Sequence, residues 1–241
     1  MILLIDGSMQ SCSVALANEQ GEVLRSLTEL TPNKQSERLA PMVHQLFGKE
    51  GREGLSALVV AEGPGSYTGL RIVAGYAKGL AYALGIPIYT VSTLQLMVDT
   101  VLEQHSELKG LENALLMPMI DARRMEVYSA LYNAQGDSVS EIEAMILTDE
   151  IKLNALQRRV GGNKLYYFGS GAEKAQDLFA QIFPSAVYLP HLIPQAEAMA
   201  NRAVELLRST TPVDTMYWEP FYLKEYQAKV GANKVLTEVL K

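Results

Sequence analysis

The residues from Gly63 to Ile72 (GPGSYTGLRI) form a glycine-rich stretch of the kind that can bind an anion. The apolar run 58–61 before it predicts a buried strand, and apolar residues at helical spacing follow it as far as Leu84. A glycine turn between a strand and a helix presents free backbone N–H groups. Neither standard phosphate-loop pattern matches, because no lysine follows Gly69 and Thr68 stands where a dinucleotide-binding loop needs glycine. The motif alone therefore assigns no ligand.

Two acidic turns are the second group of residues that could bind a ligand. Asp6 and Ser8 follow the apolar run 2–5, and Asp121 follows a second apolar run that ends at Ile120. Carboxylates and free amides suit Mg²⁺ and phosphate, so Asp6, Ser8 and Asp121 predict a vestigial nucleotide cleft. The alternative is that these residues only complete their turns. Arg123 and its neighbour replace the glycine that would let a phosphate approach the second turn.

Metal and nucleophile patterns are weak. The three histidines, His44, His105 and His191, are never spaced four apart and have no cysteine nearby, so we expect no metal site. Ser66 lies in the glycine-rich stretch, but outside the Gly-x-Ser-x-Gly pattern of a nucleophile elbow. These patterns make a peptidase the least favoured function.

The chain contains an internal repeat. A shift of 115 positions aligns Ile5-Asp6 with Ile120-Asp121 and gives seven identities in the 17 positions from Ile5 to Gly21. Each half predicts the order β-β-β-α-β-α-β-α. The first two strands of the second half follow from the alignment, and the other predicted strands are 2–5, 13–17, 23–30, 58–61, 87–91, 138–147, 164–168 and 186–189. The predicted helices begin at 36, after the glycine-rich stretch, at 93, at 148, after 171 and at 194.

This duplication predicts an α/β fold of two ribonuclease-H-like lobes in an actin-like (ASKHA) arrangement, with mixed five-stranded sheets and helices. We expect an N-terminal lobe at 1–106, a C-terminal lobe at 107–218 and a tail at 219–241. The glycine-rich stretch is expected at a strand-to-helix turn, outside the two acidic hairpins that line the cleft.

Composition limits the class of protein. The 241 residues are 48% apolar and 20% charged, as in a globular protein, and the net charge of −6 argues against autonomous nucleic-acid binding. Cys12 is the sole cysteine, which favours a reducing compartment. No run approaches the length of a transmembrane helix, and the apolar start is too short for a signal peptide. We expect a cytoplasmic protein without membrane contact.

Small residues mark one face of the helix after the glycine-rich stretch. Gly75, Gly79 and Ala83 recur every four residues, and each glycine costs a helix about 1 kcal/mol relative to alanine. Close packing inside the chain and close approach of a partner both explain this face.

Seven segments together resemble the bacterial TsaB (YeaZ) family, over essentially the full length. They are 5–6 (ID), 12–16 (CSVAL), 63–72 (GPGSYTGLRI), 91–94 (VSTL), 120–123 (IDAR), 126–128 (EVY) and 219–224 (EPFYLK). The resemblance implies a non-catalytic partner that binds and activates the TsaD-type threonylcarbamoyl transferase, which makes t6A at position 37 of tRNA. The family belongs to the glycoprotease-like proteins, also placed in peptidase family M22. An independent actin-like-fold ATPase or small-molecule kinase is the alternative.

The resemblance also implies partners and an interface. A TsaD-like transferase, a TsaE-like ATPase in a larger complex and a homodimer are expected, with tRNA contacted indirectly. ATP and metal are expected on the partner, and no cofactor is required by this chain. The implied interface residues are Leu39, Met42, Val43, Leu46, Leu70, Gly75, Gly79 and Ala83. Either Gly75→Leu or Met42→Glu is expected to abolish association and leave the fold intact. Two residues depart from the family pattern: Gln35 replaces a histidine, which puts any role of that side chain in doubt, and Gly7 replaces a threonine, which weakens a metal–nucleotide site in this lobe.

Overall fold

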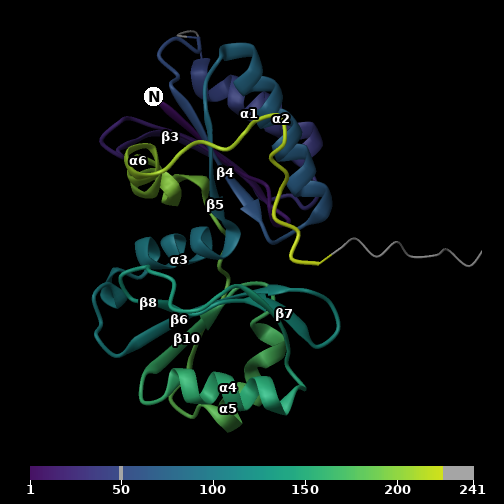
Figure 1. Ribbon diagram of the computed structural model, residues 1–241, viewed down its shortest axis with the longest axis vertical. Coiled ribbons are helices and arrows are strands. Elements are labelled where there is room, and N and C mark those ends of the chain that lie inside the picture. Colours follow the sequence, from purple (N-terminus) through teal and green to yellow (C-terminus); the bar gives the residue numbers. More distant parts are fainter. Residues whose placement is uncertain (49–50, 225–241) are drawn as a thin grey trace, which may run out of the picture.

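The fold is described for residues 1–48 and 51–224 of a computed structural model. Two mixed β-sheets lie one above the other in Figure 1, with helices packed against both. In chain order the elements are β1 (Ile2–Asp6), β2 (Cys12–Ala17), β3 (Val23–Glu29), α1 (Gln35–Phe47), β4 (Ala57–Gly63), α2 (Tyr67–Leu84), β5 (Ile88–Ser92), α3 (Thr93–Gln104), β6 (Ala114–Asp121), β7 (Glu126–Ser129), β8 (Tyr132–Asn133), β9 (Glu143–Ile146), α4 (Glu150–Val160), β10 (Lys164–Phe168), α5 (Gln176–Ile182), β11 (Val187–Leu189) and α6 (Ala200–Ser209). Short 3₁₀ turns occupy Ser106–Leu108, Glu173–Ala175 and Ala196–Met199.

The N-terminal sheet has the strand order β3-β2-β1-β4-β5. β1 pairs antiparallel with β2 and parallel with β4, as a hairpin followed by a helical crossover requires. β1 and β2 are buried along their whole length because helices cover both faces of the sheet. The order β-β-β-α-β-α-β-α predicted for the first half is therefore confirmed.

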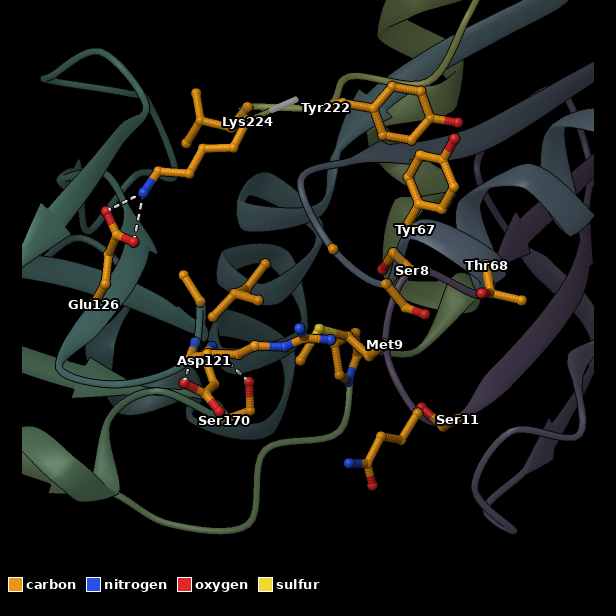
Figure 2. Close-up of a pocket in the computed structure, with 18 of the residues that line it drawn as sticks. Ser8, Met9, Ser11, Tyr67, Thr68, Asp121, Glu126, Ser170, Tyr222 and Lys224 are labelled. Atoms are coloured by element: carbon orange, nitrogen blue, oxygen red, sulfur yellow. Dashed lines mark hydrogen bonds and ion pairs between the residues drawn. The ribbon is translucent and has the colours of Figure 1, made fainter. Parts of the chain in front are cut away.

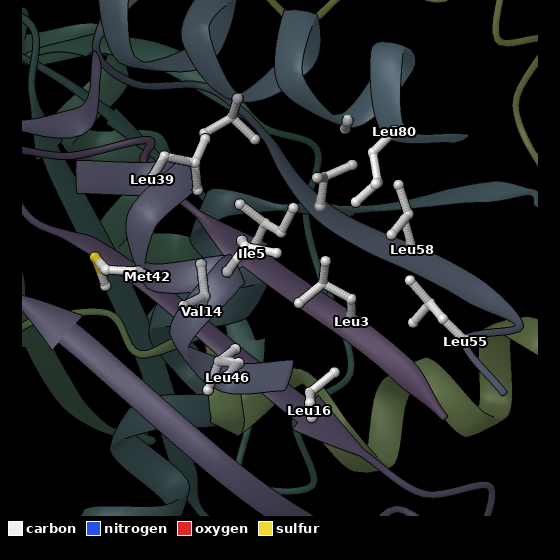
Figure 3. Close-up of a cluster of buried hydrophobic side chains, with 14 of the residues drawn as sticks. Leu3, Ile5, Val14, Leu16, Leu39, Met42, Leu46, Leu55, Leu58 and Leu80 are labelled. Carbon is white, nitrogen blue, oxygen red and sulfur yellow. The ribbon is translucent and has the colours of Figure 1, made fainter. Parts of the chain in front are cut away.

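Helix α1 packs its apolar stripe onto this sheet. Figure 3 shows Leu39, Met42 and Leu46 turned toward Leu3 and Val14 of the strands. The five apolar residues predicted as interface are all between 0% and 3% exposed: Leu39, Met42, Val43, Leu46 and Leu70. They form the core of the lobe, so the interpretation of this stripe as a partner surface is wrong. Met42→Glu would bury a charge and unfold the lobe rather than test an interface.

The C-terminal sheet repeats this plan with six strands. Its order is β11-β10-β6-β7-β9, and β8 pairs with β6. The second strand of the repeat is divided into β7 and β8. The predicted third strand, 138–147, forms a strand only over β9. The duplicated α/β fold in an actin-like arrangement is confirmed, with one strand more than predicted in the second sheet.

The repeat extends to individual hydrogen bonds. The side chain of Asn18 accepts hydrogen bonds from the backbone N–H groups of Gln20 and Glu22 at 3.0 and 2.9 Å. Asn133, 115 positions later, accepts from Gln135 and Asp137 at 3.0 and 2.8 Å. Both turns have a glycine in the left-handed region, with φ of 85° and 87°. The aligned residues thus build the same turn twice.

The two halves exchange their last helices. α3 ends the first half, yet Leu94, Met97 and Val98 pack with residues of β6 and β10. α6 and the 3₁₀ turn before it end the second half, yet Met199 and Ala203 pack on the N-terminal sheet. The predicted division at 106–107 lies between α3 and β6 and stays a prediction, and the exchanged helices pack across it.

A C-terminal segment, residues 210–224, runs from α6 past β5 and α2 to the region between the sheets (Figure 1). Backbone N–H groups of Val213 and Phe221 donate to Ile88 and Glu62 at 2.9 and 2.8 Å. Lys224 reaches Glu126 of β7 at 2.5 Å, so the segment contacts both lobes. The remainder of the predicted tail, 225–241, lies outside the described residues. Among the described helices, none is long and apolar enough to cross a membrane.

Candidate functional site

A cleft of about 1480 Å³ lies between the two lobes. Figure 2 shows Ser8, Met9, Ser11 and Thr68 along the N-terminal wall. Asp121, Glu126 and Ser170 form the C-terminal wall, and the 210–224 segment closes one end with Tyr222 and Lys224. The Tyr222 ring lies 5.0 Å from that of Tyr67, between ring centroids.

The glycine-rich stretch packs directly against the β1–β2 turn. Ser66 donates its backbone N–H to the carbonyl of Ser8 at 2.6 Å. A β-carbon on Gly65 would overlap that same carbonyl, and one on Gly69 would overlap the carbonyl of Gly7. Glycine is needed at both positions because two backbones touch there. The prediction that this stretch lies outside the cleft hairpins is wrong, since residues 65–68 line the cleft.

Asp6 does not face the cleft. It is fully buried, and its Oδ1 accepts hydrogen bonds from the Ser8 N–H and hydroxyl at 2.9 and 2.6 Å. Oδ2 has no hydrogen-bond partner among the described residues. Burial raises the pKa of the Asp6 carboxyl to about 6, against the lowering effect of the bonds from Ser8. Asp6 therefore fixes the Ser8 turn, and the cleft lining includes Ser8 but not the aspartate.

Asp121 does line the cleft, but its charge is already paired. Its Oδ1 contacts Lys174 Nζ at 2.5 Å and accepts from the Arg123 N–H at 2.9 Å. Lys174 also donates to the carbonyl of Arg124 at 2.9 Å. The two predicted carboxylates are thus held apart, one beneath a turn and the other in an ion pair, and the nucleotide site predicted from them stays a prediction.

The remaining polar and sulfur-containing side chains that could do chemistry have structural roles or lie apart. Within residues 1–48 and 51–224, no group of three or more His, Cys, Asp or Glu side chains is placed to hold a metal ion. The Ser66 hydroxyl accepts the Gly69 N–H at 3.3 Å as the N-cap of α2, which is a structural role. Burial raises the pKa of the Cys12 thiol to about 12, which leaves it unreactive near neutral pH.

A second feature is the outer face of α2. Gly75, Gly79 and Ala83 are exposed there, and a β-carbon added to either glycine would meet nothing within 4 Å in the described structure. Tyr82, beside them, is 89% exposed. The same helical spacing places Tyr82 on this face, although its side chain is large and the pattern of small residues gives no sign of it. Of the predicted interface, these three small residues alone lie on the surface.

The outer faces of α1 and α2 are neighbours on one side of the lobe (Figure 1). On α1 the exposed positions include Ala40, Pro41 and His44. α2 carries Arg71 and Lys78 and no acidic residue. We call this combined surface the α1–α2 face. On the α2 side, this face carries small residues and its charged residues are cationic.

Comparison with known proteins agrees with this architecture. Residues 20–215 match the family model described as TsaD, tRNA N6-adenosine threonylcarbamoyltransferase. The solved structure of YeaZ from Pseudomonas aeruginosa superposes with a TM-score of 0.73 at 26% identity, covering 92% of this chain and 99% of that one.

Curated relatives that carry the name "tRNA threonylcarbamoyladenosine biosynthesis protein TsaB" include those of two well-separated bacteria. That of Bacillus subtilis (strain 168) is 38% identical over 143 residues, 58% of each chain. That of Escherichia coli (strain K12) is 32% identical over 231 residues, 92% of this chain and 94% of the relative. On this similarity the chain belongs to the TsaB (YeaZ) family.

Proposed function

We propose that this chain acts in t6A synthesis as a non-catalytic subunit that binds and activates a TsaD-type threonylcarbamoyl transferase. The curated relatives are named for threonylcarbamoyladenosine biosynthesis, which supports a place in that process. The transferase carries ATP, metal and the reaction at position 37 of tRNA. A TsaE-type ATPase joins the larger complex, and the chain pairs with itself when the transferase is absent.

The exposed glycines of α2 carry this proposal. Gly75 and Gly79 weaken the helix by roughly 2 kcal/mol together relative to alanine, and no part of the described chain packs against them. A partner helix that packs close to the α2 backbone gives both glycines a purpose, because only glycine leaves that space open. The face is flanked by Tyr82, a residue type enriched in protein interfaces.

The cleft supports a subunit without its own chemistry. Asp6 is buried and Asp121 is paired with Lys174, so neither carboxylate is free to hold Mg²⁺. An independent ATPase or kinase is the second candidate, because the cleft is large enough for a nucleotide. Steady ATP turnover by the purified chain that is lost in Asp6→Asn would favour that candidate over the subunit.

Two substitutions on α2 test whether the α1–α2 face binds the transferase. Gly75→Leu and Gly79→Leu are expected to abolish co-elution with the purified transferase, because each leucine fills the space that a partner backbone needs. Circular dichroism and thermal unfolding should show an intact fold, since leucine is a better helix former than glycine. Size-exclusion chromatography with light scattering measures the complex.

Gly162→Leu is the matched control for this experiment. Gly162 is exposed, and a β-carbon there also meets nothing within 4 Å, but it follows α4 on the other lobe. This variant should bind the transferase like the unaltered chain. Full binding by Gly75→Leu and Gly79→Leu would refute the proposed interface.

A further inference from the structure

The C-terminal segment 210–224, which we call the strap, is held firmly to the N-terminal lobe. Trp218 donates its indole N–H to the Glu62 carboxylate at 3.4 Å, and the Trp218 ring packs on the core of the lobe. A β-carbon on Gly63 would lie 2.5 Å from the carbonyl oxygen of Phe221. Two backbones therefore touch where the strap passes the glycine-rich stretch, and only glycine permits that approach.

The end of the strap reaches the C-terminal lobe through an ion pair. Lys224 Nζ lies 2.5 Å from each carboxylate oxygen of Glu126 (Figure 2). Two residues earlier, the Tyr222 ring packs on that of Tyr67 at the start of α2. The side chains of Lys224 and Glu126 are 47% and 17% exposed, and a partly exposed ion pair of this kind is weak. The strap can therefore detach from the C-terminal lobe while the rest of the fold stays intact.

The exchanged helices join the two lobes at a different place. The guanidinium group of Arg202 on α6 donates to both carboxylate oxygens of Asp99 on α3, at 2.7 and 2.8 Å. In Figure 1, α3 and α6 lie to the left of the point where the strap ends. The lobes are thus joined by packed helices on one side and by the Lys224 ion pair on the other.

The strap also runs beside the outer face of α2. Lys78, next to the exposed glycines of α2, donates to the carbonyl of Met216 at 3.4 Å, and its Nζ lies 5.9 Å from the centroid of the Trp218 ring. The carboxylate of Asp214 accepts the N–H groups of Met216 and Tyr217 at 2.9 and 3.4 Å, which fixes the turn 214–218. Met216 and Tyr217 are each 77% exposed. A partner seated on α2 therefore also meets this turn.

We propose that the strap couples the α1–α2 face to the cleft. A partner that packs on α2 and on the turn 214–218 stabilises the attachment of Lys224 to Glu126, and so holds the two lobes together. The partner is the transferase, so this inference rests on the proposed function. When the strap is detached, the lobes remain joined through α3 and α6 and move apart at the other side. Because the ion pair is weak, a modest difference in partner affinity between the two states shifts the equilibrium between them.

The distance between spin labels on the two lobes tests the coupling in the chain alone. Thr31→Cys and Thr148→Cys place the labels on exposed residues, close in the chain to Leu30 and Ile146 of the cleft lining. The native thiol, Cys12, is buried and does not compete for the label. Double electron–electron resonance then reports the separation of the lobes, whether or not a partner binds.

Two variants are expected to lengthen and broaden this distance distribution. Lys224→Gln removes the ion pair itself, and Asp214→Ala loosens only the turn beside α2. The charge-reversed double variant Lys224→Glu/Glu126→Lys should restore the original distance. Lys152→Gln is the matched control, because it breaks an ion pair with Glu143 inside the C-terminal lobe and should change nothing. An unchanged distance in Lys224→Gln or in Asp214→Ala would overturn the proposal.

Binding of the purified transferase tests the same coupling from the other direction. By linkage, Lys224→Gln should weaken binding about fivefold although the α1–α2 face is unaltered, and Lys152→Gln should bind normally. Equal affinity of Lys224→Gln and the unaltered chain would also overturn the proposal. No binding by the unaltered chain would instead refute the proposed function, and the label distances would then decide by themselves whether the strap couples the turn to the cleft.

Discussion

Gly69→Ala is expected to destabilise the protein by about 3 kcal/mol, although alanine is the better helix former. A β-carbon at Gly69 would overlap the carbonyl oxygen of Gly7, a backbone atom that cannot rotate away. The β1–β2 turn and the start of α2 would have to separate, which also distorts the N-terminal wall of the cleft. Urea unfolding followed by circular dichroism measures the loss.

Gly75→Ala on the same helix is the control for that experiment. A β-carbon at Gly75 meets nothing within 4 Å in the described structure, so the variant should gain about 1 kcal/mol from helix propensity alone. The two substitutions are chemically identical and should have opposite signs. Equal stability of the two variants would show that the turn and the helix do not touch as described.

Asp6→Asn is expected to remove the pH-dependent destabilisation that ionisation of the buried Asp6 carboxyl causes. The pKa of Asp6 rises from 3.8 to about 6 because burial disfavours its charged form. A carboxyl whose pKa is raised on folding destabilises the protein as pH rises from about 4 through 6, and has no effect below both values. A shift of about two units corresponds to roughly 3 kcal/mol.

The measurement is the unfolding free energy of both proteins at several pH values between 4 and 8. The difference, variant minus unaltered chain, should increase by roughly 3 kcal/mol toward alkaline pH, since the other titrating groups are common to both and cancel. Asparagine retains an Oδ1 that accepts the two hydrogen bonds from Ser8. A difference that is flat with pH would mean that Asp6 is not buried as a charged group.

Local patterns in the sequence predicted most of the fold. The 115-residue repeat, with its matching Asn18 and Asn133 turns, predicted two copies of one lobe because equal turns and equal strand order produce equal topology. Elements with strong periodicity, such as α3, begin where the sequence predicts. The broken second strand of the second half, β7 and β8, was missed because a short interruption leaves no clear periodicity.

The site was predicted less well, for physical reasons. A stripe such as Leu39 to Leu46 has the same helical spacing whether it faces the sheet or a partner, so the pattern alone cannot distinguish core from interface. The exchange of α3 and α6 between lobes is a long-range arrangement with no local signal. The contact of Gly69 with Gly7 joins loops some sixty residues apart, and nothing in the local sequence marks Ser11 as part of the cleft lining.

Reconstituted t6A synthesis is the most direct test of the proposed role. The assay contains a purified TsaD-type transferase, its TsaE-type ATPase, threonylcarbamoyl donor and tRNA, with the chain present, absent or replaced by Gly75→Leu. We predict t6A at position 37 only with the unaltered chain or Gly162→Leu, and none from the chain without the transferase. Undiminished t6A formation in the absence of the chain, or with Gly75→Leu, would contradict an activating subunit that acts through the α1–α2 face.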